Sequence, residues 1–318
     1  MTEAAAPGPP IATVRPRTSV SSRIVTLVAV LVPPLGVLAA MGLLWEIAVR
    51  PVDVILLVTL YIACGLGITV GFHRLFSHKA FAATPAVRAV LAILGSMTLQ
   101  GPVTQWVTDH RKHHALSDRE GDPHSPHGGR EGLFGGLAGF FHAHMGWLVS
   151  TKGMERGRRY GRDLYEDRLI HTIDRLYMLW VVLTLAIPFA VGYAVDPTWE
   201  GGLTGLVWGG LMRIFLFHHM TWSVNSICHT FGTRAFDTDD QSRNNWVIAF
   251  PTFGEGWHNN HHAFPASAIH GLGRRQVDVS WWTIRALERA GWAWNVKVPN
   301  AERIARRAAR EPRPQTQT

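Results

Sequence analysis

The chain has 318 residues, of which 47% are hydrophobic and only 17% are charged, and its formal net charge is +8. This composition excludes an ordinary pair of soluble enzyme domains and favours a protein of the membrane. Two cysteines exclude a disulfide framework, and the positive charge requires no nucleic acid partner, because cytoplasmic loops of membrane proteins collect basic residues.

Four long apolar runs follow one another along the chain, and each reaches the ~20 residues that cross a hydrocarbon core of ~30 Å. We therefore predict an all-α, polytopic membrane protein with four transmembrane helices, at residues 24–45, 54–72, 176–195 and 201–224. A cleaved signal peptide is the alternative for the first run, whose length exceeds a usual signal core. A shorter apolar run at 86–99 is expected in the membrane interface or inside the bundle.

Basic residues are unevenly distributed between these runs. Thirteen lie at positions 74–168 and twelve follow the fourth run, whereas the linker at 196–200 has none. We therefore expect both termini and the central loop in the cytoplasm, and the protein in the plasma membrane. The tails at 1–20 and 308–318 are expected to be disordered, and residues 21–307 to form a single domain. Arg213, inside the fourth run, is either functional or snorkels toward the cytoplasmic end of its helix.

The spacing HxxHH occurs twice, in HRKHH at 110–114 and in HNNHH at 258–262. Positions i, i+3 and i+4 share one helix face, so each copy is expected to present three imidazoles toward one point. His73 and His78 follow the second run, and His229 lies four residues after Asn225. A helix from residue 201 to His229 would be about 43 Å long, which exceeds the hydrocarbon core. These histidines can then converge in a cytoplasmic helical cap.

Nine imidazoles are too many for one metal ion and fit two ions with about four or five nitrogens each. Imidazole suits zinc, copper, iron and nickel, so the ligand type alone does not select the metal. A structural zinc site usually includes cysteine, which this chain almost lacks. Neutral ligands beside a membrane suit a redox pair that activates oxygen, which favours iron.

In this order, HRLFSH, HRKHH and GEGWHNNHH, with NSICH before the last, resemble the histidine boxes of the membrane fatty acyl desaturases, and most of all the delta-9, stearoyl-CoA desaturase type. The resemblance runs from about Gly71 to Pro265. It implies an O2-dependent enzyme that inserts a cis double bond into a saturated acyl-CoA. It also implies two iron ions (Fe2+/Fe3+), with O2 as co-substrate, Asn225 holding a water, and the following ligands: His73, His78, His110, His113, His114, His229, His258, His261 and His262.

The same resemblance implies an acyl tunnel lined by Gln100, Trp106 and Thr221, although Trp106 has an alternative as an interfacial anchor. Long-chain acyl-CoA is the expected carrier. Acyl-carrier protein and intact lipid stay open, because Thr108 stands where the animal enzymes have an arginine in the coenzyme A contact region. Arg74 and the basic stretch at 155–162 are expected to meet phosphates.

No flavin or dinucleotide fingerprint, iron–sulfur cysteine set or fused cytochrome b5 sequence is present, so no bound flavin or haem is expected. The electron donor is then another protein. We expect a ferredoxin or rubredoxin, with its NAD(P)H reductase, on the basic cytoplasmic face.

Asp109, Asp122 and Glu255 lie beside the histidine motifs and are candidates to orient the imidazoles, with solvated loop carboxylates as the alternative. Eight further histidines are expected to be structural or to lie on the surface, with His144 as the main exception, because HMGWL also matches the family: His124, His127, His142, His144, His171, His218, His219 and His270.

Two other functions compete with desaturation. A membrane hydroxylase of an alkane or lipid would use the same boxes, and product analysis separates the two. A metal transporter would need polar ligands near the middle of the membrane, whereas these histidines lie at or beyond the ends of the apolar runs. Chain length, double-bond position and oligomeric state are left open by the sequence.

Overall fold

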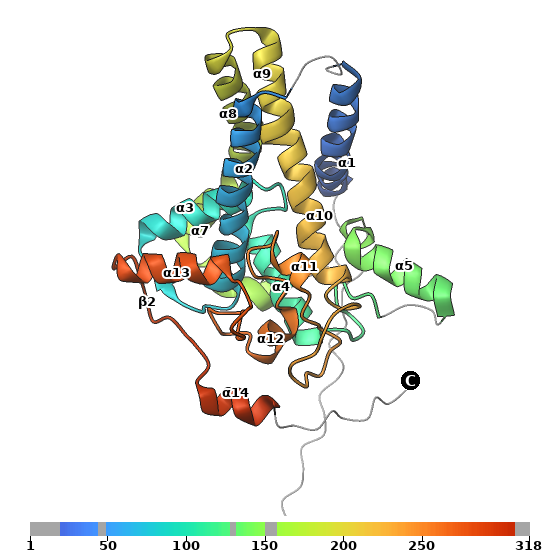
Figure 1. Cartoon of the computed structure of the whole chain (residues 1–318), viewed down its shortest axis with the longest axis vertical. Helices are drawn as coiled ribbons and strands as arrows, with labels where there is room; N and C mark the ends of the chain where they lie inside the picture. Colours follow the sequence, from blue (N-terminus) through green and yellow to red (C-terminus); the bar gives the residue numbers. More distant parts are fainter. Residues whose placement is uncertain (1–19, 44–48, 128–131, 150–157, 309–318) are drawn as a thin grey trace, which may run out of the picture.

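The computed structural model describes residues 20–43, 49–127, 132–149 and 158–308, which are mostly helical (Figure 1). Within these ranges the sheet structure is a single pair in which β1 (Ala82–Ala83) runs antiparallel to β2 (Ala293–Trp294). The predicted disordered tails lie outside the described residues, apart from Val20 and Ala308, which lie at helix ends.

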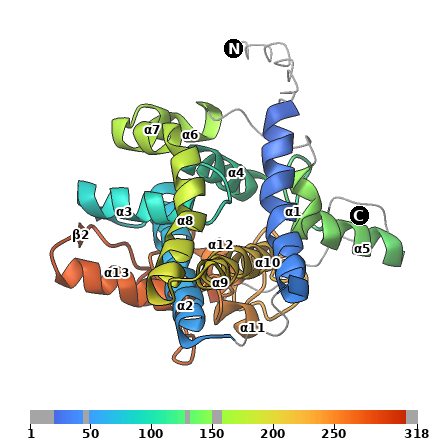
Figure 2. The same ribbon diagram turned by 90° about the horizontal axis from the view of Figure 1, so that it is seen from above.

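Two described helices are long and apolar enough to cross a membrane. One joins α2 (Pro51–Leu66) to the π-helix η1 (Gly67–Ser77), and the other is α8 (Tyr177–Val195). The remaining predicted spans lie on α1 (Val20–Leu43) and on the continuous helix of α9 (Trp199–Gly205), η3 (Leu206–Met212) and α10 (Arg213–Ser226). Because η3 packs against α1, α2 and α8, these helices form one bundle (Figure 2). The four-span topology stays a prediction.

Arg50 ties together the bundle end that lies uppermost in Figure 1. Pro51 begins α2 at the first helical position, which suits a residue without an amide proton. The Arg50 guanidinium bonds Asp53 on α2 at 3.1 Å, Asp196 after α8 at 2.6 Å and the Gly201 carbonyl on α9 at 2.8 Å. One side chain therefore fixes three helix ends.

Shorter helices gather around the opposite end of the bundle (Figure 1). They are α3 (Pro85–Ser96), α4 (Val103–Leu116), α5 (Gly132–His144), η2 (Gly146–Leu148), α6 (Arg158–Tyr165), α7 (Arg168–Arg175), α11 (Trp246–Ala249), α12 (His258–Ala263), α13 (Val279–Arg289) and α14 (Ala301–Ala308). The structure thus has a helical layer where the histidine-bearing segments were expected. Its cytoplasmic location stays a prediction.

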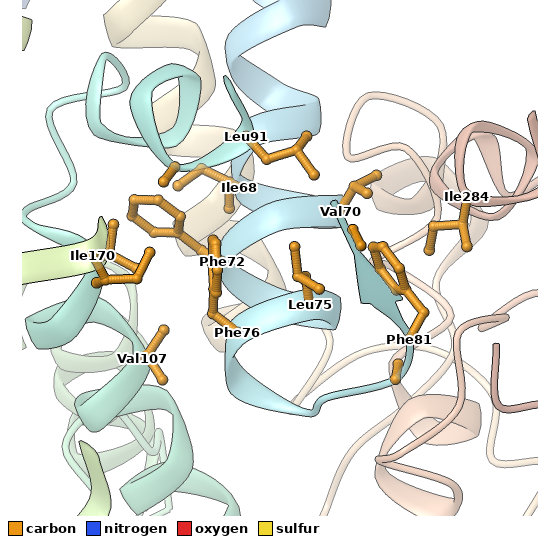
Figure 3. Close-up of a cluster of buried hydrophobic side chains, with 14 of the residues drawn as sticks. Ile68, Val70, Phe72, Leu75, Phe76, Phe81, Leu91, Val107, Ile170 and Ile284 are labelled. Carbon is orange, nitrogen blue, oxygen red and sulfur yellow. The ribbon is translucent and has the colours of Figure 1, made fainter. Parts of the chain in front are cut away.

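The main apolar core surrounds η1 (Figure 3). Phe72 and Phe76 extend from η1 toward Val107 of α4 and Ile170 of α7, and Ile284 of α13 lies on the other side. This packing holds the helix that carries His73 between three neighbouring elements.

The short apolar run predicted at 86–99 forms α3, which packs against η1. A Cβ atom at Gly67 would lie 2.2 Å from the Gly95 amide nitrogen, so the two helices approach too closely for any larger residue at this crossing. The run therefore packs inside the bundle, although Val90 on its outer face is 55% exposed.

The helix of the fourth run ends at Ser226 rather than at His229, which corrects the predicted boundary. His229 lies in the turn at 227–230, where the Cys228 amide still bonds the Ser223 carbonyl at 3.3 Å. The Arg243 amide donates to the Cys228 carbonyl at 2.7 Å, and this contact fixes the turn against a later part of the chain.

Candidate metal centre

Nine histidines come together in two groups. The five-histidine cluster consists of His73, His78, His110, His114 and His261. The four-histidine cluster consists of His113, His229, His258 and His262. Within each cluster one nitrogen from every ring lies within 4.8 Å of the others. These are the nine histidines that the sequence placed in one site, and their number per cluster suits one metal ion each.

Each HxxHH motif contributes to both clusters, whereas the sequence predicted that each would point to one place. In α4 the first and third histidines enter the five-histidine cluster, and the second, His113, enters the other. In α12 the assignment is reversed, and the second histidine, His261, joins the five-histidine cluster. A step of three residues turns a side chain by about −60° and a step of four by about +40°, so the second histidine diverges from the other two.

The π-helical geometry of η1 brings His73 and His78 together. Five residues along an α-helix would separate these side chains by about 140°. In η1 the His78 amide instead donates to the His73 carbonyl, five residues earlier, at 3.1 Å, and the two rings lie 4.9 Å apart. This wide turn, a geometry frequent at functional sites, explains the HxxxxH spacing of the first motif.

Three aspartates bond the Nδ1 atoms of three imidazoles in the four-histidine cluster. The pairs are His113 with Asp122 (2.9 Å), His229 with Asp118 (2.8 Å) and His262 with Asp240 (2.6 Å). A carboxylate at Nδ1 holds the proton on that nitrogen and leaves the Nε2 lone pair for a metal ion. The sequence identified Asp122 but missed Asp118 and Asp240.

Glu255 bonds the Nδ1 atom of His73 in the five-histidine cluster. It also accepts a hydrogen bond from Arg74 at 3.2 Å, and Arg74 donates to Asp278 at 2.9 Å. Arg74 is 0% exposed, so the prediction that it meets carrier phosphates is wrong. It balances the carboxylate that orients His73.

At most clustered positions with a shifted pKa, the electrostatics favour neutral imidazoles, which are the form that binds metal ions. Burial, followed by the neighbouring imidazoles, lowers the pKa of five of these histidines: His78, His110, His114, His258 and His261. Although burial opposes it, the Asp122 carboxylate raises the pKa of His113. In turn His113 lowers the pKa of Asp122 against the effect of burial, which keeps this carboxylate ionised.

The nitrogen atoms of both clusters face one another in a way that fits cations. The Nε2 atoms of His73 and His261 lie 3.1 Å apart, and those of His229 and His258 lie 3.0 Å apart. The Nε2 atoms of His113 and His262 are buried without a hydrogen-bond partner. Lone pairs held this close, beside ionised carboxylates, are consistent with a metal centre.

The three residues predicted to line the acyl tunnel form one hydrogen-bonded group, the Gln100 triad. Gln100 Nε2 donates to Thr221 Oγ1 at 3.0 Å, and Trp106 Nε1 donates to Gln100 Oε1 at 3.2 Å. The Trp106 indole stacks on His110, with ring centroids 5.1 Å apart and planes 18° from parallel. The triad therefore borders the five-histidine cluster directly.

Three other predicted residues are not members of either histidine cluster. Asn225 is half-buried on α10, four residues before His229. Asp109 is buried on α4. His144 lies outside both clusters, where its ring bonds Ser226 Oγ and His219 Nδ1 at 3.0 Å each.

Two histidines outside the matching positions also contact the clusters. The His124 ring lies 4.3 Å from that of His113, and the His270 ring lies 4.4 Å from that of His261. His270 is 1% exposed and has a carboxylate oxygen of Glu255 3.5 Å from its Nδ1 atom. Their spacing in the sequence carried no signal for either contact.

Membrane-length helices and two histidine clusters, one buried and one partly buried, define a helical protein with a candidate histidine-rich metal centre. Residues 51–294 match the family described as "Fatty acid desaturase". The chain is 44% identical over 275 residues to the hex-5-enoyl-(acyl-carrier protein) acetylenase of Moorena producens, covering 86% of this chain and 85% of that protein. It belongs to the fatty acid desaturase family.

Two further relatives differ from the first in the names of their substrates. The sn-1 stearoyl-lipid 9-desaturase of Anabaena variabilis is 38% identical over 239 residues, 75% of this chain and 81% of that protein. The acyl-CoA C20 Delta5-desaturase of Anemone leveillei is 38% identical over 245 residues, 76% of this chain and 72% of that protein. The chain is thus an oxidoreductase of fatty acid desaturation in lipid metabolism.

Proposed function

We propose that the protein inserts a cis double bond at the delta-9 position of a long saturated acyl chain carried as a coenzyme A thioester. The observation that carries this proposal is the contact between the Gln100 triad and the five-histidine cluster through stacked Trp106 and His110. An acyl chain that follows the triad would have its methylenes beside the imidazoles.

The nine histidines would hold two iron ions, with Asn225 contributing through a water. Bound iron supplies the oxidising chemistry that removes two hydrogen atoms from neighbouring methylenes, at the expense of O2 and two external electrons. The chain itself fixes the imidazole tautomers through Asp118, Asp122, Asp240 and Glu255. Burial of His73, His261 and the four-histidine cluster would limit the access of bulk water to the reacting carbons.

The relatives differ in the acyl carrier that their names give, which is acyl-carrier protein, acyl-CoA or lipid. Of the basic stretch at 155–162, Arg159 and Arg162 are exposed and can meet phosphates. Residues 155–157 lie outside the described part. Thr108 is buried, and its hydroxyl donates to the Thr104 carbonyl at 2.7 Å, so it offers the carrier no contact.

The membrane arrangement and the electron donor complete the proposal. Four spans in the plasma membrane would place the clusters in the cytoplasm, where a ferredoxin or rubredoxin can reach them. Arg303 and Arg306 on α14 are exposed and suit an acidic donor. Turnover with purified donor should fall as salt is raised, because ions screen this attraction. Constant turnover would contradict electrostatic docking.

Product analysis tests the proposal. A desaturase-deficient host expressing the parent or His261→Ala is analysed by gas chromatography and mass spectrometry, with derivatisation to locate double bonds. A cis-9 monoene from the parent alone supports the proposal, whereas hydroxylated or alkynoyl products would identify another oxidation. Purified protein supplied with stearoyl-CoA, stearoyl-acyl-carrier protein or stearoyl-lipid then identifies the carrier, and turnover only with the last two would contradict coenzyme A as the carrier.

A further inference from the structure

The loop between α3 and α4, residues 97–102, carries Gln100 in an unusual backbone conformation. Leu99 has φ +61° and Gly101 has φ +106°. A branched residue in the left-handed region is unfavourable by about 1–2 kcal/mol, so other contacts must hold Leu99 there. The position of Gln100 therefore depends on what binds this loop.

Helices α8 and α10 bind the loop through its carbonyl groups. The Met97 carbonyl accepts hydrogen bonds from Arg213 Nη1 at 3.0 Å and from Thr184 Oγ1 at 2.7 Å. The Thr98 carbonyl lies 2.8 Å from His218 Nε2, which donates to it. All five residues are buried. The first half of the loop is thus held by two neighbouring helices.

The second half of the loop is held by its amide groups. The Gly101 amide donates to the Tyr177 hydroxyl at 3.1 Å. The Val103 and Thr104 amides at the start of α4 donate to the carboxylate of Asp174 at 2.8 and 3.1 Å. The loop is thus bonded by side chains from three other helices, α7, α8 and α10, so it has little freedom to shift.

Arg213 is the unusual member of this arrangement, because it is 0% exposed within the fourth predicted span. Its guanidinium bonds the Gly209 carbonyl at 3.2 Å, the Met97 carbonyl and Thr184 Oγ1. These acceptors account for all three of its nitrogens, so the side chain does not snorkel toward the helix end. Burying a cation among neutral acceptors is costly, and a planar fork that joins α10, α8 and the loop gives it a structural purpose.

We infer that Arg213, together with Thr184 and His218, positions the α3–α4 loop and thereby sets which carbons of the acyl chain lie beside the metal centre. This inference rests on the proposed function. Gln100 is the member of the triad that lies on the loop, whereas Thr221 lies on α10 and Trp106 lies on α4 with His110. A displaced loop therefore moves Gln100 relative to its two partners and to the imidazoles. Arg213 is a positioning residue and does not touch the substrate.

We call Arg213, Thr184 and His218, with their bonds to the Met97 and Thr98 carbonyls, the clamp. Two variants remove different parts of it. Arg213→Lys keeps the charge, but one ammonium group cannot reproduce the planar fork. Thr184→Val keeps the side-chain shape and deletes the hydroxyl. Arg50→Lys is the matched control, because Arg50 also joins three helix ends but contacts no part of the loop. Product regioisomers, kcat, KM, melting temperature and hydrogen exchange at residues 97–102 are measured for each.

The clamp variants should lower kcat about tenfold or more, since misplacement by about 1 Å can cost a hundredfold, and should add a second double-bond isomer. Their loop amides should exchange faster than those of the parent, while Arg50→Lys changes neither the isomers nor the loop exchange. Folded clamp variants with parental isomers and exchange would overturn the inference. If the parent forms no unsaturated product, the proposed function fails. The positioning role of Arg213 would in that case be overturned by parental hydrogen exchange at residues 97–102 in the folded clamp variants.

Discussion

Replacing Asp122 by asparagine tests how the carboxylates prepare the histidines for metal. Asp122 is fully buried and accepts from His113 Nδ1 at 2.9 Å and from the Asp118 and His124 amides at 2.9 and 3.1 Å. The single asparagine oxygen can keep only one of the two amide bonds, because these amides bond different carboxylate oxygens, and in either orientation its NH2 group lies within reach of His113 Nδ1. That contact favours the tautomer with the proton on Nε2, which blocks the ligand position.

We expect Asp122→Asn to weaken the binding of one metal ion only. Among the clustered histidines, the Asp122 carboxylate bonds only His113, which belongs to the four-histidine cluster. Loss of such a supporting carboxylate typically lowers metal affinity 10–100-fold, or about 1.4–2.7 kcal/mol. Protein loaded with iron is dialysed against graded chelator, and bound metal is measured by elemental mass spectrometry. The variant should lose one of its two ions at 10–100-fold lower free chelator than the parent.

Asp53→Asn is the matched control. Asp53 is also fully buried and bonds a cation, Arg50, at 3.1 Å, in the first turn of α2, and it belongs to neither histidine cluster. It should affect melting temperature without changing metal retention. Equal metal loss in both variants would mean that retention reports general destabilisation. Parental retention in Asp122→Asn would refute the assigned role of the carboxylate.

Further outcomes follow from the same structure. Burial lowers the pKa values of several clustered histidines below the value of about 6.5 that they have in the unfolded chain. In acid the unfolded chain therefore binds more protons than the folded protein does. The melting temperature of metal-free protein should therefore fall from about pH 7 to pH 5, and a rise would contradict this sign. Gly67→Ala, whose Cβ would meet Gly95, should destabilise by about 1–3 kcal/mol in chemical unfolding. Gly136→Ala should leave the free energy of unfolding unchanged, because no atom lies within 4 Å of the added Cβ. Equal losses of stability in the two variants would refute the steric argument.

The meeting of the histidines could be predicted because their spacing is local. HxxHH keeps three rings within about 100° of one another around a helix, and both copies do lie on helices, α4 and α12. Which ring joins which cluster could not be predicted in this way. The assignment of His113 and His261 depends on how the two helices face each other, which spacing within one helix does not contain.

The supporting carboxylates show a second limit of the sequence. Asp118 and His229 are 111 residues apart, and Asp118 lies just after α4 with φ +57°, where no helical or strand periodicity applies. Arg74 resembles other basic residues at the end of an apolar run, so exposure was the natural prediction. Its burial follows from Glu255 and Asp278, which are 181 and 204 residues away.

The helix α10 connects the clamp to the metal centre. Arg213 and Thr221 are eight residues apart, about 12 Å along an α-helix, and a similar length of chain separates Thr221 from His229. The same helix therefore carries a residue that holds the α3–α4 loop, a residue bonded to Gln100, and the approach to the four-histidine cluster. Because hydrogen bonds at every turn make this helix stiff, the contacts between α10 and the loop set the position of Gln100 relative to Thr221. If the inferred role of Arg213 holds, a change in double-bond position requires no change in any metal ligand, and substitutions at the contacts of Arg213 and His218 should produce it.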